Sequence, residues 1–153
     1  MYAWNHWASG EPARLLIAHT DPQLRSQLAS QFGHNGWVVH QFEDGNQLLD
    51  WLSEDLLFNG GPGKSDLIVA DARLPGRNGH ELLADLRRAG WSIPFILTSK
   101  KESQDPLAEM QRYPRAFIFE APFEIYDLVT ASYYLLDRTS VEDSRALPWA
   151  DVS

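Results

Sequence analysis

Short apolar runs alternate along the chain with segments whose hydrophobic positions recur every three or four residues. Continuous apolar runs are typical of strands that are buried on both faces, as in a parallel sheet. We assign strands to residues 15–18, 37–39, 67–70, 93–98 and 116–119. Helical spacing follows each of them, with helices beginning near Asp21, Asp44, Gly79, Asp105 and Ile125. Five strands alternating with five helices predict an α/β fold with a parallel sheet covered on both faces.

The carboxyl ends of the predicted strands carry several polar side chains. Ligand chemistry in open parallel sheets lies beyond these ends. The residues that directly follow a predicted strand are therefore the first candidates for a site: His19, Thr20, Asp21, Asp71, Ala72, Arg73, Thr98, Ser99, Lys100, Glu120, Ala121 and Pro122.

Three stretches at these positions resemble a known family. They run from Asp66 to Leu82 (DLIVADARLPGRNGHEL), from Ile93 to Ser99 (IPFILTS) and from Ala121 to Phe123 (APF). In this order and spacing they resemble the receiver domain of bacterial two-component response regulators. The similarity covers residues 14–136, with 1–13 as an N-terminal extension and 137–153 as a C-terminal tail. It implies a flavodoxin-like (βα)5 fold, a doubly wound parallel sheet of five strands in the order 2-1-3-4-5.

The resemblance assigns two functional positions that the chain retains. Asp71 occupies the position of the aspartate that accepts a phosphoryl group in this family. Thr98 occupies the position of the hydroxyl that responds to phosphorylation.

Other positions of the family's site have changed. His19 and Thr20 replace the two acids that help to hold Mg²⁺, and Ala121, directly before Pro122, replaces a lysine that contacts the phosphoryl oxygens. Magnesium prefers oxygen ligands, often carboxylates, and phosphoryl transfer depends on positioning and charge neutralisation. We therefore expect weak or absent Mg²⁺ binding, no other cofactor or metal site, and no catalytic residue.

The charge of Asp71 suggests what has replaced the metal ion. We hypothesise that His19 hydrogen-bonds or ion-pairs with Asp71 and that the pair tightens as the pH falls. The alternative is a loop histidine without a partner. Asp21, one residue beyond the acid pair, is expected to cap the following helix. Lys100 and Lys101 are expected to be solvated loop charges and not substitutes for the missing lysine.

Composition and charge exclude several classes of protein. The 13 basic and 21 acidic residues give a net charge of −8, which argues against bulk nucleic-acid binding. The chain has no cysteine, so disulfides, thiolate metal sites and cysteine nucleophiles are excluded. No apolar run approaches the roughly 20 residues that cross a bilayer. The N-terminus has no signal-like apolar region. We expect a cytoplasmic protein that binds neither DNA nor membranes.

The segment from Gly60 to Ser65 (GGPGKS) resembles part of a phosphate-binding P-loop. Phe58 stands where that motif needs a glycine, and the segment precedes a strand instead of joining a strand to a helix. A surface connection is the favoured interpretation.

Aromatic residues outside the predicted core suggest a binding surface. Trp4, Trp7 and Trp149 lie in the terminal segments, where little core is available to cover them. Tyr126, Tyr133 and Tyr134 lie on or near the last predicted helix. The resemblance implies that this helix, with the fourth helix and the fifth strand, forms the face that the family uses for dimerisation and partner contact. Ordinary half-buried tyrosines are the alternative.

The sequence therefore favours an atypical, stand-alone receiver domain that is not an enzyme and signals through protein–protein contact. Its expected partner is a histidine kinase or a separate effector, with a homodimer through the last helix as a further expectation. A second hypothesis keeps a phosphorelay receiver that is phosphorylated at Asp71. A third is a small-molecule-binding or hydrolytic flavodoxin-like protein that uses His19, Asp71, Thr98 and Ser99.

Overall fold

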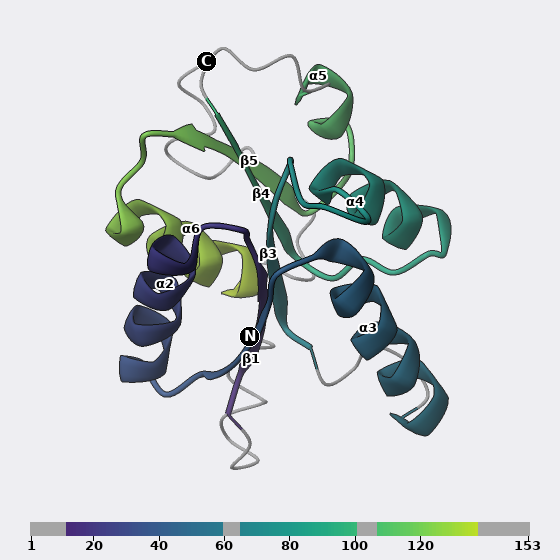
Figure 1. Ribbon diagram of the computed structural model, residues 1–153, viewed down its shortest axis with the longest axis horizontal. Coiled ribbons are helices and arrows are strands. Elements are labelled where there is room, and N and C mark those ends of the chain that lie inside the picture. Colours follow the sequence, from purple (N-terminus) through teal and green to yellow (C-terminus); the bar gives the residue numbers. More distant parts are fainter. Residues whose placement is uncertain (1–11, 60–64, 101–106, 138–153) are drawn as a thin grey trace.

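Five parallel strands form one sheet at the centre of the molecule (Figure 1). The computed structural model describes residues 12–59, 65–100 and 107–137. The strands are β1 (Arg14–Ala18), β2 (Val38–Phe42), β3 (Leu67–Asp71), β4 (Phe95–Lys100) and β5 (Ala116–Ala121). Their order is β2-β1-β3-β4-β5, and every neighbouring pair is parallel. The predicted fold class and strand order are confirmed.

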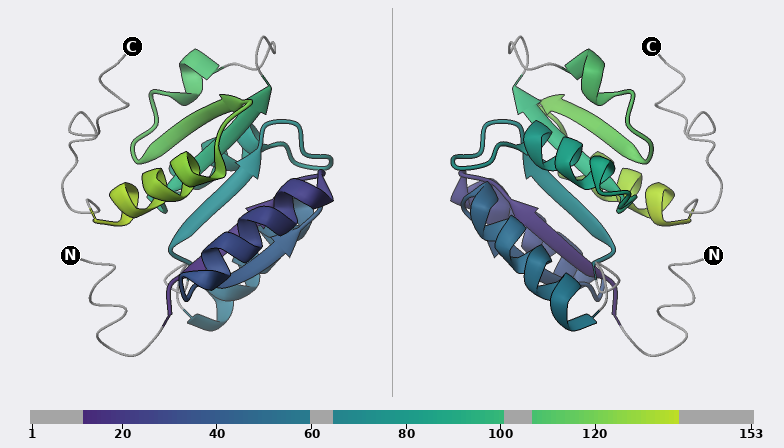
Figure 2. Two further views of the ribbon diagram at one scale, coloured as in Figure 1. Left: turned by 90° about the vertical axis from the view of Figure 1, so that its left-hand side faces the viewer. Right: turned by 90° about the vertical axis from the view of Figure 1, so that its right-hand side faces the viewer.

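Helices cover both faces of this sheet. They are α2 (Pro22–His34), α3 (Gly45–Asn59), α4 (Gly79–Arg88), α5 (Leu107–Met110) and α6 (Ile125–Asp137). Figures 1 and 2 show α2 and α6 on one face and α3 and α4 on the other. Successive residues of a strand therefore pack into two different hydrophobic cores, one on each face of the sheet. Leu15 and Ile17 pack with α2 and α6, whereas Leu16 and Ala18 pack with α3 and α4.

The helix that follows β1 begins as the sequence predicts. The Asp21 carboxylate accepts hydrogen bonds from the N–H groups of Gln23 and Leu24, at 2.9 and 3.4 Å, and Pro22 occupies the first turn. A side-chain oxygen at this position satisfies N–H groups that have no partner within the helix. The predicted capping role of Asp21 is therefore confirmed.

Three strands differ from the prediction by two residues or more, and one of them is β5, which ends at Ala121 and not at residue 119. β2 runs to Phe42 and not only to residue 39, because this edge strand is half exposed and includes the polar His40 and Gln41. β4 begins at Phe95 and not at residue 93, and it continues through Ser99 to Lys100. Proline has no N–H for a sheet ladder, so Pro94 contributes only its carbonyl, which accepts from the N–H of Ile68 at 3.0 Å.

The beginning of α4 packs closely against the end of β3. A Cβ atom on Gly79 would lie 2.4 Å from the carbonyl oxygen of Asp71 and 2.5 Å from the Leu97 side chain. Asn78 and Glu81 form a reciprocal capping box that fixes the start of the helix. This close approach holds the backbone of Asp71 in place.

None of the described helices is both long enough and apolar enough to span a membrane. Several positions discussed in the sequence analysis lie outside the described residues: residues 60–64, Lys101, Asp105 and the tryptophans of the terminal segments.

Candidate functional site

Asp71 lies at the carboxyl end of β3, directly opposite Thr98 in the register with β4. The Thr98 hydroxyl donates a hydrogen bond to Asp71 Oδ1 at 2.7 Å. Thr98 is buried, and the Asp71 side chain is only 16% exposed. The sheet register therefore places these two residues together at a sheltered edge.

His19 reaches the same carboxylate from β1, the other neighbour of β3. Its Nε2 lies 3.2 Å from Asp71 Oδ1, and its side chain is 12% exposed. The second oxygen, Oδ2, accepts the N–H of Arg73 at 3.0 Å. The hypothesised contact between His19 and Asp71 is present, and both carboxylate oxygens have hydrogen-bond donors.

The His19 backbone is held on both sides. Its N–H donates to the carbonyl of Phe42 at 3.2 Å, and its own carbonyl accepts from Arg25 Nη1 at 2.5 Å. Arg25 also donates to Gln41 at 3.3 Å, so it ties α2 to β2 at this point. Sequence reasoning missed Arg25, because only its position one turn after Asp21 pointed to this edge.

The His19 ring is oriented by the N–H of Asp21, which donates to Nδ1 at 3.0 Å. A nitrogen that accepts this bond carries no proton, so in the neutral ring the proton is on Nε2 and is donated to Asp71. The Asp21 N–H thus orients the ring so that Nε2 faces Asp71. The expectation that the pair tightens as the pH falls stays a prediction.

The pKa of Asp71 is lowered. Burial of the carboxylate acts to raise the pKa, but the hydrogen bonds from His19, Thr98 and the Arg73 N–H outweigh it. Asp71 is therefore ionised at neutral pH. Its stabilising effect is present above the ordinary carboxyl pKa and is lost as the pH falls through the lowered value.

The donor set around Asp71 differs from one that suits Mg²⁺. Asp71 supplies one carboxylate, His19 directs an N–H at it, and the Asp21 carboxylate caps α2. No group of three or more His, Cys, Asp or Glu side chains that could hold a metal ion occurs among the described residues. Magnesium prefers several oxygen ligands in octahedral geometry, and the residues present do not fit it.

The position of the missing lysine lies beside Lys100. Ala121 pairs with Lys100 in the register of β4 and β5, and the Lys100 side chain is exposed. Within the described part of the chain, the groups that contact the Asp71 carboxylate belong to His19, Thr98 and Arg73. Lys100 is thus placed as the expected solvated charge.

The Thr98 hydroxyl is not arranged as the nucleophile of a hydrolytic relay. A serine or threonine nucleophile is activated when its hydroxyl donates to a base such as histidine. Thr98 donates to Asp71 instead, and Ser99 Oγ donates to the Lys100 carbonyl at 3.4 Å. The geometry therefore gives no support to the hydrolytic hypothesis.

The three tyrosines of the predicted interface have different surroundings. Tyr126 is 77% exposed. Tyr133 packs against the core beside α2, and its hydroxyl accepts from Trp37 Nε1 at 2.9 Å. Tyr134 is half-buried. Tyr126 is thus the tyrosine available to a partner, whereas Tyr133 stabilises the contact between α6 and α2.

The chain is similar to known proteins in sequence and in fold. The family model for the response regulator receiver domain matches residues 15–131. Response regulator MprA of Mycolicibacterium vanbaalenii is 26% identical over 147 residues, which cover 93% of this chain and 60% of that protein. MprA of Mycobacterium sp. strain KMS is 29% identical over 146 residues, with the same coverage. The chain therefore spans about 60% of the length of these relatives.

Solved structures have the same fold. The Francisella response regulator 1452 receiver domain superposes with a TM-score of 0.68 at 26% identity, covering 83% of this chain and 98% of that one. A response regulator receiver domain from Clostridium thermocellum gives a TM-score of 0.70 at 15% identity, with coverage of 83% and 96%. At that identity the second similarity concerns the fold alone.

Proposed function

Because this chain belongs to the response regulator receiver domain family of two-component signalling, we propose that it is an atypical member that signals through protein contacts without conventional Mg²⁺-dependent phosphorylation. The observation that carries this proposal is the hydrogen bond from His19 Nε2 to Asp71 Oδ1, at 3.2 Å. In this proposal the imidazole takes the place that the metal ion has beside the aspartate in other family members.

The hydrogen bonds to Asp71 work against a phosphoacceptor role. A carboxylate oxygen must present a lone pair to phosphorus, but Oδ1 already accepts from Thr98 and His19. Donors that lower the pKa of Asp71 also reduce its nucleophilicity. Replacement of the two family acids and the lysine removes the cations that would neutralise an incoming phosphoryl group.

The proposal is tested by intact mass spectrometry of the chain after incubation with Mg²⁺ and acetyl phosphate. We expect the wild-type mass to remain unchanged, as in the Asp71→Asn control. Phosphorelay at Asp71 is the competing function. A stoichiometric gain of one phosphoryl group in the wild type, absent from Asp71→Asn, would establish it and refute our proposal.

We further propose a histidine kinase or a separate effector as the partner, with a homodimer through α6 as a second arrangement. The exposure of Tyr126 on α6 supports this surface, since tyrosine is frequent at the centres of protein interfaces. The Asp71 site then acts as a fixed structural feature and not as a phosphorylation switch.

A further inference from the structure

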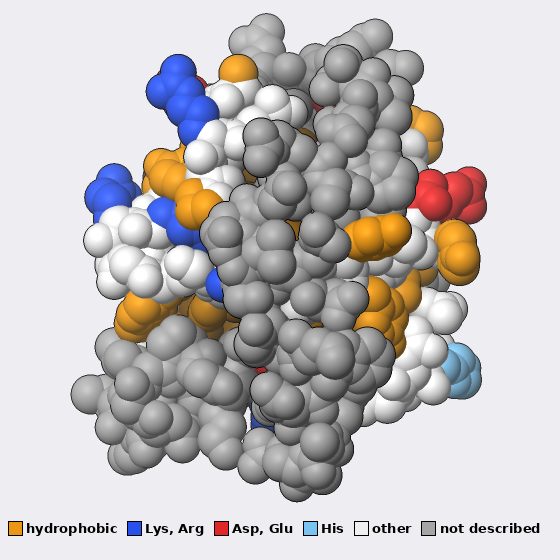
Figure 3. All heavy atoms as spheres, turned by 180° about the vertical axis from the view of Figure 1, so that it is seen from behind, with side chains coloured by type: hydrophobic (Ala, Val, Ile, Leu, Met, Phe, Trp, Pro, Cys, Tyr) orange, Lys and Arg blue, Asp and Glu red, His pale blue; other side chains and the backbone are white. Residues whose placement is uncertain are grey.

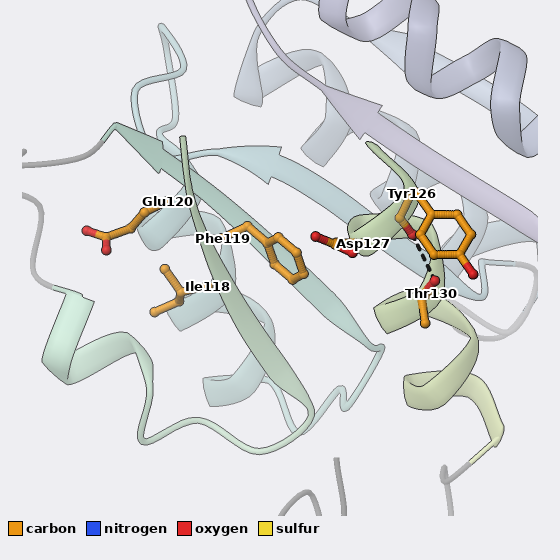
Figure 4. A pocket seen from close by; sticks show the side chains of 6 residues that line it. All are labelled: Ile118, Phe119, Glu120, Tyr126, Asp127 and Thr130. Carbon is orange, nitrogen blue, oxygen red and sulfur yellow. Dashed lines mark hydrogen bonds between the residues drawn. The ribbon is translucent and has the colours of Figure 1, made fainter. Parts of the chain in front are cut away.

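A groove of about 370 Å³ lies where β5 meets the first turns of α6 (Figure 4). Ile118, Phe119 and Glu120 of β5 and Tyr126, Asp127 and Thr130 of α6 line it. Its volume is in the range of small-molecule and side-chain pockets, roughly 300–1,000 Å³. Its floor and walls are mainly apolar, with Tyr126 exposed beside them.

The groove also carries negative charge. Glu120 and Asp127 are both exposed at its rim, and no basic residue lines it. Figure 3 shows acidic side chains next to hydrophobic ones on the side of the molecule where α2 and α6 lie, whereas Lys and Arg side chains lie toward the opposite side. A complementary occupant therefore needs apolar side chains next to a cation.

The free edge of the sheet borders the same groove. β5 is the last strand of the sheet and pairs with β4, with no further described strand beyond it. One row of its backbone N–H and C=O groups therefore faces away from the sheet, where an extended segment can lie alongside.

A segment of this chain has the required chemistry. Residues 145–149 read Arg-Ala-Leu-Pro-Trp, in which a cation stands beside two large apolar side chains. They follow α6, which ends at Asp137. Along the axis of α6, Tyr126 lies about 17 Å from Asp137, toward the start of the helix. The eight residues from Asp137 to Arg145 can span about 26 Å when extended, so the segment can reach the groove of its own chain.

We propose that residues 145–149 dock in this groove of the same molecule, with Leu147 and Trp149 against Phe119 and Tyr126 and with Arg145 near Glu120 and Asp127. The docked segment covers the surface proposed for the partner, so partner binding must displace it. This proposal does not depend on whether Asp71 is phosphorylated.

Paramagnetic relaxation provides the test, because a chain without cysteine accepts a single engineered label. A nitroxide is attached to the full chain at Asp151→Cys, and amide signals are compared before and after reduction of the label. We expect selective loss of signal at residues 118–120 and 126–130. Weak, even broadening over the surface, or selective broadening elsewhere, would overturn the proposal.

Two further samples distinguish the contacts involved. In the same labelled chain, Arg145→Glu, Leu147→Ser and Trp149→Ser together are expected to abolish the selective loss while leaving other amide signals unchanged. Persistence of the loss would show that these side chains do not dock. A mixture of isotope-labelled chain without nitroxide and unlabelled chain with nitroxide should show no loss at the groove. A loss in that mixture would assign the groove to a second copy and refute docking within one molecule.

Discussion

Replacing Arg87 by alanine is expected to lower the free energy of unfolding by about 3 kcal/mol, because several carbonyl groups lose charged hydrogen-bond donors. The Arg87 guanidinium donates to the carbonyls of Trp91 and Ile93, both at 2.8 Å, and to that of Pro114 at 3.1 Å. A further bond of 3.3 Å reaches the carbonyl of Arg115. One side chain thus joins α4 to the segments that precede β4 and β5.

The environment of Arg87 explains the size of this effect. Burial, and to a lesser extent the charge of Arg115, lowers the pKa of Arg87 to about 10, so the side chain remains protonated at neutral pH. Hydrogen bonds to charged groups contribute about 1.5–3 kcal/mol each, although water replaces some of them after truncation. A loss of about 3 kcal/mol is a large part of the 5–15 kcal/mol typical of a domain.

Urea unfolding followed by tryptophan fluorescence measures this difference. Arg88 is the matched control, because it is the next residue, is 70% exposed and makes one ion pair with Asp85. Arg88→Ala should change stability by less than about 1 kcal/mol. Equal effects of the two substitutions would show that the carbonyl contacts of Arg87 contribute little.

Restoring the family's residues is expected to make Asp71 a phosphoacceptor. The variant combines His19→Asp, Thr20→Asp and Ala121→Lys, which supply a carboxylate pair for Mg²⁺ and a cation for the phosphoryl oxygens. It also removes the imidazole N–H from Asp71 Oδ1. Metal charge stabilisation contributes several kcal/mol, so the rate of phosphorylation should rise about a thousandfold or more.

The rate is measured by intact mass during incubation with acetyl phosphate and Mg²⁺. The same triple variant with Asp71→Asn should stay unmodified, which locates the phosphoryl group. A folded triple variant that remains as inert as the wild type would show that the three replaced residues do not limit the reaction.

Much of the fold followed from the sequence because buried strands give unambiguous patterns. β3 was predicted at residues 67–70 and is observed at Leu67–Asp71, since its apolar run is buried on both faces. The edge strand β2 was predicted less well, because exposed Gln41 interrupts its pattern. Edge strands contact one neighbour only, so fewer of their residues must be apolar.

The site was predictable in part for a similar reason. Parallel strands end at one edge, so the proximity of His19, Asp71 and Thr98 followed from their positions after predicted strands. The sequence could not show which ring nitrogen of His19 faces Asp71, because the backbone N–H of Asp21 orients the ring. Arg25 was missed for the same reason, since its partner is the backbone carbonyl of His19.

The central claim is that the His19 imidazole takes the place of a metal ion at Asp71. A pH titration of the Asp71 carboxyl carbon by ¹³C NMR tests it most directly, in the wild type and in His19→Phe, which keeps a ring but removes the N–H. We predict a lowered wild-type pKa that added Mg²⁺ leaves unchanged, and a higher pKa in His19→Phe. A wild-type titration that shifts with Mg²⁺, or the same pKa in both chains, would contradict the account.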